Sequence, residues 1–216
     1  MSIIYRTTLT PAKLELLTGW LPSQPWYRPT GSAPDLVKAG GFRLDDPEGE
    51  VGIEFLVAAD AQEGVVSPYL VPMTYRGRPR DGDGTGLIGT AEHGVLGKRW
   101  IYDGTTDPVL VSELVALIQG TAEPQAQSQN DTPDPTVLSR PALSGPAFVT
   151  GFEPVPSEEG GTDLRVRVGD RVLAVRFHRI LTPVVGESVP AGCVSAAWKQ
   201  PDGTHAQGVF VTARAV

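Results

Sequence analysis

The sequence is poor in the residues that build cross-linked or metal-bound proteins. Its 216 residues include a single cysteine, Cys193, and three histidines, His93, His178 and His205. One cysteine cannot form an internal disulfide, and no histidine has a second histidine at metal-ligand spacing. The composition therefore excludes a disulfide scaffold and argues against a zinc or iron-sulfur protein.

Long apolar runs are also missing. One of the longest, PVLVSELVALI, is shorter than the roughly 20 residues that span a bilayer. The N-terminal MSIIYRTTLTP lacks the basic and then apolar pattern of a signal peptide. A net charge of -7 disfavours nonspecific attachment to nucleic acid or to an anionic membrane. We therefore expect a cytoplasmic protein with no nucleic-acid partner and no membrane partner.

Glycine and proline are abundant instead, with 25 and 20 copies, which predicts many turns and short elements. Extended segments alternate with turn signals from Leu36 to Tyr75, a pattern typical of antiparallel strands. We also expect a strand at residues 2–8 and a hairpin within residues 86–104, with its turn near EHGVLG. The first half of the chain is therefore predicted to be built around an antiparallel meander.

Two helices are predicted from the signals at their ends. Thr10 and Pro11 form an N-cap and first-turn pair for the first helix. Asp107 and Pro108 form the same pair for the second helix, and Gly120 is its stop signal. These helices are expected to pack on the meander.

Residues 121–144 are rich in Pro, Gln, Ser, Asn and Asp, which is typical of a linker. After them, DLRVRVGDRVLAVRFHRIL predicts a hairpin with its turn at Gly169-Asp170, and the last segment predicts another around Pro201-Asp202-Gly203. We therefore predict an α+β domain over residues 1–120, the linker, and a small all-β antiparallel module over residues 145–216.

The stretch DGDGTGLIGTAE is close to a calcium loop. Asp81, Asp83 and Thr85 stand at the first three ligand positions and Glu92 at the bidentate one. Nearby prolines and glycines disfavour the flanking helices that an EF-hand needs. The same stretch spells G-x-G-x-x-G over 84–89, but it lacks the preceding strand and following helix of a dinucleotide loop. A lone calcium site and a plain hairpin connection both stay open.

Two other sets of side chains are candidate binding surfaces. The first is an aromatic and acidic set that an enzyme of unrecognised mechanism would use: Trp26, Glu54, Trp100 and Tyr102. The second is a basic stripe predicted on the outward face of the late hairpin: Arg165, Arg167, Arg176 and Arg179. This stripe is either a solvated sheet face or a site for an acidic partner or phosphorylated ligand.

Several segments resemble the N-terminal cap domain of actinobacterial maltokinases, and more closely the stand-alone cap-like proteins of that group. The segments are TTLTPAKLELLTGWLPSQPWY, KAGGFRLDDPEGEVGIEFLV, YLVPMTYRGRP, LIGTAEHGVLGKRWIYDGTTDPVLVSELVALIQG and AEPQAQS. The resemblance implies a curved antiparallel sheet with packed helices, of cystatin-like character. Maltokinases use ATP and magnesium to phosphorylate maltose for α-glucan synthesis.

Kinase activity is not carried over to this chain. After Gly120 the sequence has neither the aspartate base nor the metal-binding motif of a kinase. We therefore predict no catalytic residue and no cofactor. The resemblance implies a non-catalytic accessory or regulatory protein whose partner is a sugar kinase or an α-glucan enzyme. A small-ligand or calcium-binding module and an enzyme of unrecognised mechanism are the alternatives.

Overall fold

The computed structural model describes residues 8–62, 65–82, 84–127, 132–142, 148–184 and 190–216. Most of this part of the chain is antiparallel sheet, with few helices. The helices are α1 (Lys13–Trp20), α2 (Pro108–Gln119) and the short 3-10 turns η1 (Leu21–Ser23) and η2 (Gly104–Thr106). None of the helices in these ranges is long and apolar enough to cross a membrane.

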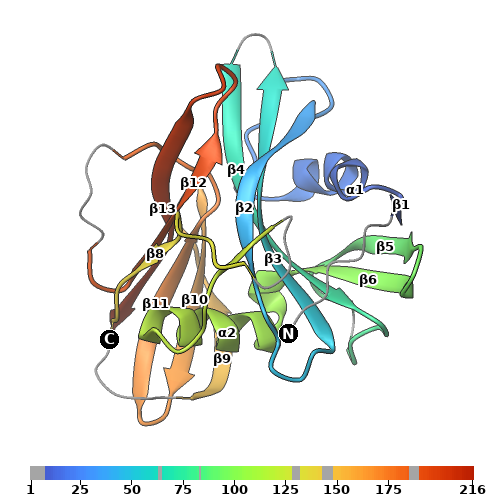
Figure 1. The fold of residues 1–216 in the computed structure, drawn as a ribbon. Helices are drawn as coiled ribbons and strands as arrows, with labels where there is room; N and C mark the ends of the chain where they lie inside the picture. The colour runs from blue at the N-terminus through green and yellow to red at the C-terminus, as the bar shows by residue number, and fades with distance from the viewer. Residues whose placement is uncertain (1–7, 63–64, 83, 128–131, 143–147, 185–189) are drawn as a thin grey trace.

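The strands join into one continuous path in the order β1-β5-β6-β4-β3-β2-β12-β13-β11-β10-β9 (Figure 1). Two short strands lie off this path, β7 against β2 and β8 against β12. Their bounds are β1 (Leu9–Thr10), β2 (Leu36–Leu44), β3 (Val51–Gln62), β4 (Val65–Arg76), β5 (Leu87–His93), β6 (Gly97–Asp103), β7 (Gln125–Ala126), β8 (Leu138–Ser139), β9 (Val149–Val155), β10 (Gly161–Val168), β11 (Arg171–His178), β12 (Cys193–Lys199) and β13 (His205–Ala215).

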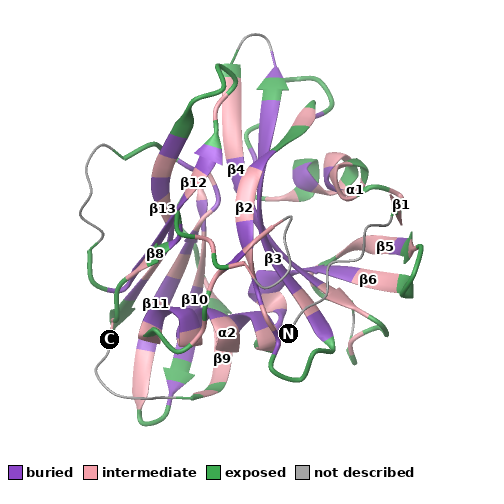
Figure 2. Ribbon diagram, in the orientation of Figure 1, coloured by how far each residue is buried: buried purple, intermediate pink, exposed green. Residues whose placement is uncertain are grey.

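Strand β3 separates two hydrophobic cores. Phe55 and Val57 point to the face where α2 and the C-terminal strands pack, whereas Leu56 and Ala58 point to the face where α1 packs. Alternate residues of a strand face opposite sides of the sheet, so a strand covered on both sides needs a nearly continuous apolar run. The segment VGIEFLVAA is such a run, and Figure 2 shows β3 buried along most of its length.

The C-terminal strands join the first sheet at two places. Trp198 of β12 pairs with Gly40 of β2. On the other flank of β3, the backbone N–H of Leu70 in β4 donates to the carbonyl of Arg179 at 2.8 Å. The two parts of the chain are therefore connected through backbone pairing on both flanks of β3.

Side chains from both parts of the chain share one hydrophobic core. Phe42 stacks on Phe55 with 4.6 Å between ring centroids, and Phe210 of β13 lies 6.1 Å from Phe42. Trp198 is the next ring in this row, 6.2 Å from Phe210. Side chains pack extensively across the predicted boundaries at residues 120 and 145. The division of the chain into two domains and a linker stays a prediction.

Helix α2 is confirmed together with its end signals. Asp107 is the N-cap and accepts a hydrogen bond from the N–H of Val109 at 3.0 Å, and Pro108 is the first helical residue. Gly120 ends the helix in the left-handed conformation, with φ of 76°. These signals are local in sequence, which explains why they could be recognised without the tertiary structure.

Helix α1 begins later than predicted. Thr10 does not cap it, because this residue lies in β1 and pairs with Glu92 of β5. Ala12 occupies the N-cap position, and its N–H donates to the Glu15 side chain at 3.3 Å. The expected strand at residues 2–8 lies outside the described residues except for Thr8.

The three predicted hairpins are confirmed. β5 pairs with β6, β10 with β11 around Gly169-Asp170, and β12 with β13 around residues 201–203. In the predicted linker, β7 and β8 each pair with one strand of the main path. Those described parts of residues 121–144 therefore run extended along the sheet, while residues 128–131 and 143–144 lie outside the described structure.

Candidate functional site

Three of the five buried carboxylates in the described chain are paired with cations. Glu54, Asp103 and Asp107 are 5%, 6% and 0% exposed. A buried carboxylate is either a reactive group with a raised pKa or a structural group held by cations and donors. Their partners decide between these two roles.

Glu54 lies on the α1 face of β3 and is held by donors from three different segments. The Lys13 ammonium in α1 lies 2.9 and 2.8 Å from its two carboxylate oxygens, and the Tyr75 hydroxyl donates at 2.5 Å. The side-chain amide of Gln127, which follows β7, donates a hydrogen bond at 3.1 Å. Both oxygens are thus engaged, and the side chain ties α1 and the residue-127 segment to the sheet.

The protonation states at this site follow from its surroundings. Burial alone raises the pKa of Glu54, but the Lys13 charge and the hydrogen bonds from Lys13 and Tyr75 bring this pKa below its usual value. Burial and the nearby Glu54 raise the pKa of Tyr75 well above its usual value. At neutral pH an ionised carboxylate therefore faces a protonated phenol. A carboxylate with a lowered pKa and no vacant oxygen is a poor general base.

Asp107 is neutralised inside the same sheet. The guanidinium of Arg76 in β4 makes two bonds of 2.7 Å to its two oxygens, and the Thr74 hydroxyl donates at 2.8 Å. Burial raises the pKa of Asp107, but the hydrogen bonds from Arg76 and Thr74 and the Arg76 charge lower it overall. This aspartate both caps α2 and fixes the helix to the sheet.

Asp103 is neutralised by a residue from the C-terminal part of the chain. Arg179, which follows β11, is 0% exposed, and its guanidinium lies 2.5 Å from the Asp103 carboxylate. It also donates to the hydroxyls of Thr105 and Thr162, at 3.1 and 2.8 Å. Burial lowers the pKa of Arg179, and the Asp103 charge opposes that change. Arginine stays protonated in proteins, so this is an ion pair within the protein interior.

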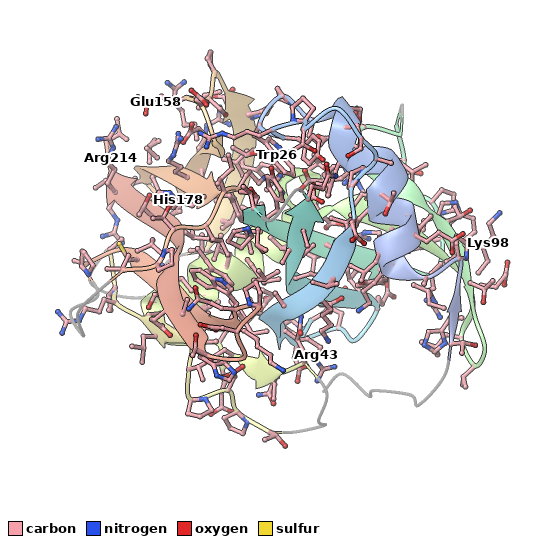
Figure 3. All side chains as sticks on the ribbon, turned by 90° about the horizontal axis from the view of Figure 1, so that it is seen from above. Trp26, Arg43, Lys98, Glu158, His178 and Arg214 are labelled. Carbon is pink, nitrogen blue, oxygen red and sulfur yellow. The ribbon has the colours of Figure 1, made fainter. Side chains whose placement is uncertain are left out.

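The Arg179 guanidinium also lies over the Trp26 ring, with 4.8 Å to the centroid. Trp26 contacts Trp20 at 5.8 Å and Tyr69 at 6.0 Å between ring centroids. The irregular segment after α1 thus packs its aromatic side chains around a buried cation. In Figure 3 Trp26 lies in the crowded interior between the two sets of strands.

The predicted aromatic and acidic surface is distributed over both faces of the sheet. Trp26 and Glu54 lie on the α1 face. Tyr102 pairs with Thr74, whose hydroxyl bonds Asp107 on the α2 face, and Trp100 lies two residues before it on the same side of β6. The structure therefore does not bring these four side chains to one pocket.

The predicted calcium residues are also spread out. Asp81 and Thr85 are exposed residues of the connection between β4 and β5, and Asp83 lies outside the described residues. Glu92 lies near the far end of β5, opposite Lys98. No group of three potential metal-ligating side chains occurs within the described ranges. The glycines at 84–89 lead into β5 rather than into a helix.

The predicted basic stripe is partly wrong. Arg165 and Arg167 do face outward, with side chains 56% and 59% exposed, and Arg165 pairs with Glu153 at 3.2 Å. Arg179 instead points inward. In β11 and just after it, Val175, Phe177 and Arg179 share one face by their two-residue spacing, so the alternation itself carried the signal that was missed.

The fold and these contacts define a class of protein: an antiparallel-sheet protein whose buried acids serve as fixed structural connections. Residues 20–107 match the family model of the maltokinase N-terminal cap domain. The predicted resemblance is thereby confirmed for this region, which we call the cap-like region. No curated protein matches the chain.

Proposed function

We propose that the protein is a non-catalytic accessory or regulatory protein that acts by binding another protein. The observation that carries this proposal is that three buried acids of the cap-like region have cations and hydrogen-bond donors on their carboxylates. Glu54, Asp103 and Asp107 each face a cation and at least one further donor. Groups in this state hold a scaffold together, and a scaffold of this kind is suited to presenting a surface.

The family match suggests the class of partner. A domain that resembles the cap of a maltokinase fits an association with a sugar kinase or with an enzyme of α-glucan metabolism in the cytoplasm. We extend the resemblance to a cystatin-like sheet, which is supported by the packing of α1 against one face of β3 and β4. The run β12-β13-β11-β10-β9 supports treating residues 145–216 as a β module that packs on this sheet.

Affinity purification from the native cell, followed by measurement with purified components, tests the proposal. We expect a kinase or glycan enzyme to form a saturable complex with the full chain and to change its kcat or KM in that complex. A parallel assay of ATP consumption with maltose should give no turnover by the chain alone. Recovery of no stable partner, or turnover by the chain alone, would contradict the proposal.

A further inference from the structure

The turn between β5 and β6 lies at the margin of the cap-like region, away from the C-terminal strands. In Figure 1 the β5-β6 hairpin extends from the body of the molecule beside α1, and in Figure 3 Lys98 lies at the outer margin, far from Trp26. Two apolar residues occupy the turn, Val95 and Leu96, and they are 59% and 42% exposed. We call residues 93–99 the hairpin tip.

The backbone of the hairpin tip is held in place by its own side chains. The N–H groups of Val95 and Leu96 both donate to the Nδ1 atom of His93, at 3.3 and 3.0 Å. The guanidinium of Arg99 donates to the Leu96 carbonyl at 2.8 Å. Burial and the Arg99 charge lower the pKa of His93, which keeps this ring neutral and able to accept. The two apolar side chains are therefore presented outward on an ordered turn.

Preordering matters because binding through a loop normally costs the entropy of fixing it. A turn that is already fixed loses less on association. Exposed apolar side chains scattered singly are common on protein surfaces, but a pair on an ordered, projecting turn has the form of an interface anchor.

The charges around the tip indicate what it would bind. Lys98 and Arg99 both follow the apolar pair in the chain, with Glu92 opposite Lys98, whereas the chain as a whole carries a net charge of -7. Lys98 lies over the Trp100 ring, 5.2 Å from its centroid, which holds the ammonium beside the tip. A cationic tip on an acidic protein favours a partner with carboxylates at the contact, and it orients the approach.

We propose that the hairpin tip inserts Val95 and Leu96 into an apolar pocket, rimmed by carboxylates, on a protein partner. This inference rests on the proposed function and specifies the surface that would carry it. A membrane surface is the less favoured occupant, because the net negative charge repels anionic lipid and two apolar side chains give little insertion. Self-association through the tip would require an apolar pocket rimmed by carboxylates on a second copy of this chain.

The test uses the full chain and two pairs of matched substitutions. Val95→Ser with Leu96→Ser removes the apolar tip. Val65→Ser with Val184→Ser removes two apolar side chains that are 64% and 49% exposed elsewhere. Surface changes of this kind leave the fold intact, which circular dichroism and thermal unfolding verify. The partner isolated with the wild-type chain is purified, and its Kd is measured by calorimetry for each variant.

We expect the tip variant to weaken binding by about 10-fold or more and the control variant to stay within about twofold of the wild type. Lys98→Glu should also weaken binding, and should reduce its dependence on salt. A tip variant that binds within twofold of the wild type overturns the inference while leaving the proposed function intact. Failure of the wild-type chain to bind any partner overturns both.

Two further measurements separate the other occupants. Sedimentation with vesicles containing anionic lipid should leave the wild-type chain in the supernatant, and sedimentation velocity should show no self-association that depends on the tip. Tip-dependent binding to the vesicles, or a dimer abolished in the tip variant, would replace the protein partner and overturn the inference as stated.

Discussion

Two buried aspartates, four residues apart in the segment DGTTD, are neutralised in different ways. Asp107 is paired with Arg76, a residue of the same cap-like region, 31 positions earlier. Asp103 is paired with Arg179, 76 positions later and beyond the family match. The first pair lies within the cap-like region. The second pair connects this region to the C-terminal part of the chain. In this protein the cap-like region is therefore completed by the C-terminal strands.

Removal of the second pair should have the largest effect. In Arg179→Met the side-chain volume is largely kept, but the Asp103 carboxylate stays buried without its cation. We expect a loss of about 3–5 kcal/mol in the free energy of unfolding, measured with urea. Arg176→Met is the matched control, since Arg176 pairs with Asp163 in a partly exposed position, and it should cost about 1 kcal/mol or less. Similar losses of unfolding free energy in the two variants would show that the buried pair contributes no more than the partly exposed pair.

The pair that lies within the cap-like region should come next. Asp107→Ala removes the α2 N-cap together with both bonds to Arg76, and we expect a loss of about 2–4 kcal/mol. Asp107→Asn keeps a capping side chain and should lose less. Urea unfolding of both variants measures the difference. Equal stabilities would mean that the cap contributes nothing here.

The Glu54 connection should have a smaller, pH-dependent effect. Glu54→Gln weakens the bond to Lys13, and we expect a loss of about 1–3 kcal/mol at pH 7. The pKa of Glu54 is lowered in the folded state, so its contribution is complete above the unfolded pKa of about 4.3 and is lost as the pH falls further. The gap between wild type and variant should therefore narrow on acidification. A gap that widens would contradict the assigned ionisation.

Calcium should have the smallest effect. Glu92 lies five residues beyond Leu87 along β5, roughly 16 Å at strand spacing, so it is far from the point where the loop enters the strand. We expect no binding heat with millimolar calcium. Heat that appears with the wild type and with the control Asp170→Ala, and disappears in Asp81→Ala, would restore the calcium hypothesis.

Local signals made much of the fold predictable. The caps of α2 and the turns of the late hairpins depend on residues within a few positions of one another, so the sequence alone identifies them. The start of α1 was misplaced because Thr10 is held by pairing with Glu92, 82 positions away in the chain. Local capping propensity does not decide the conformation of a residue that pairs with a strand far away in the sequence.

The contacts of the candidate site were less predictable. Glu54 was identified as a candidate, but its partners Lys13 and Gln127 lie 41 and 73 positions away. Arg179 was assigned to the surface with the other arginines, although its spacing from Phe177 placed it on the inward face. Charge favours an outward position, and only the distant Asp103 makes burial of this guanidinium possible.

Arg179 connects the cap-like region and the C-terminal strands, and we expect it to stabilise them as one unit. Native-state hydrogen exchange of Arg179→Met, compared with the wild type, tests it most directly. We expect amides of β3 and β4 to lose protection by the same free energy as amides of β10 to β13. Loss of protection confined to the C-terminal strands, with β3 and β4 unchanged, would contradict it.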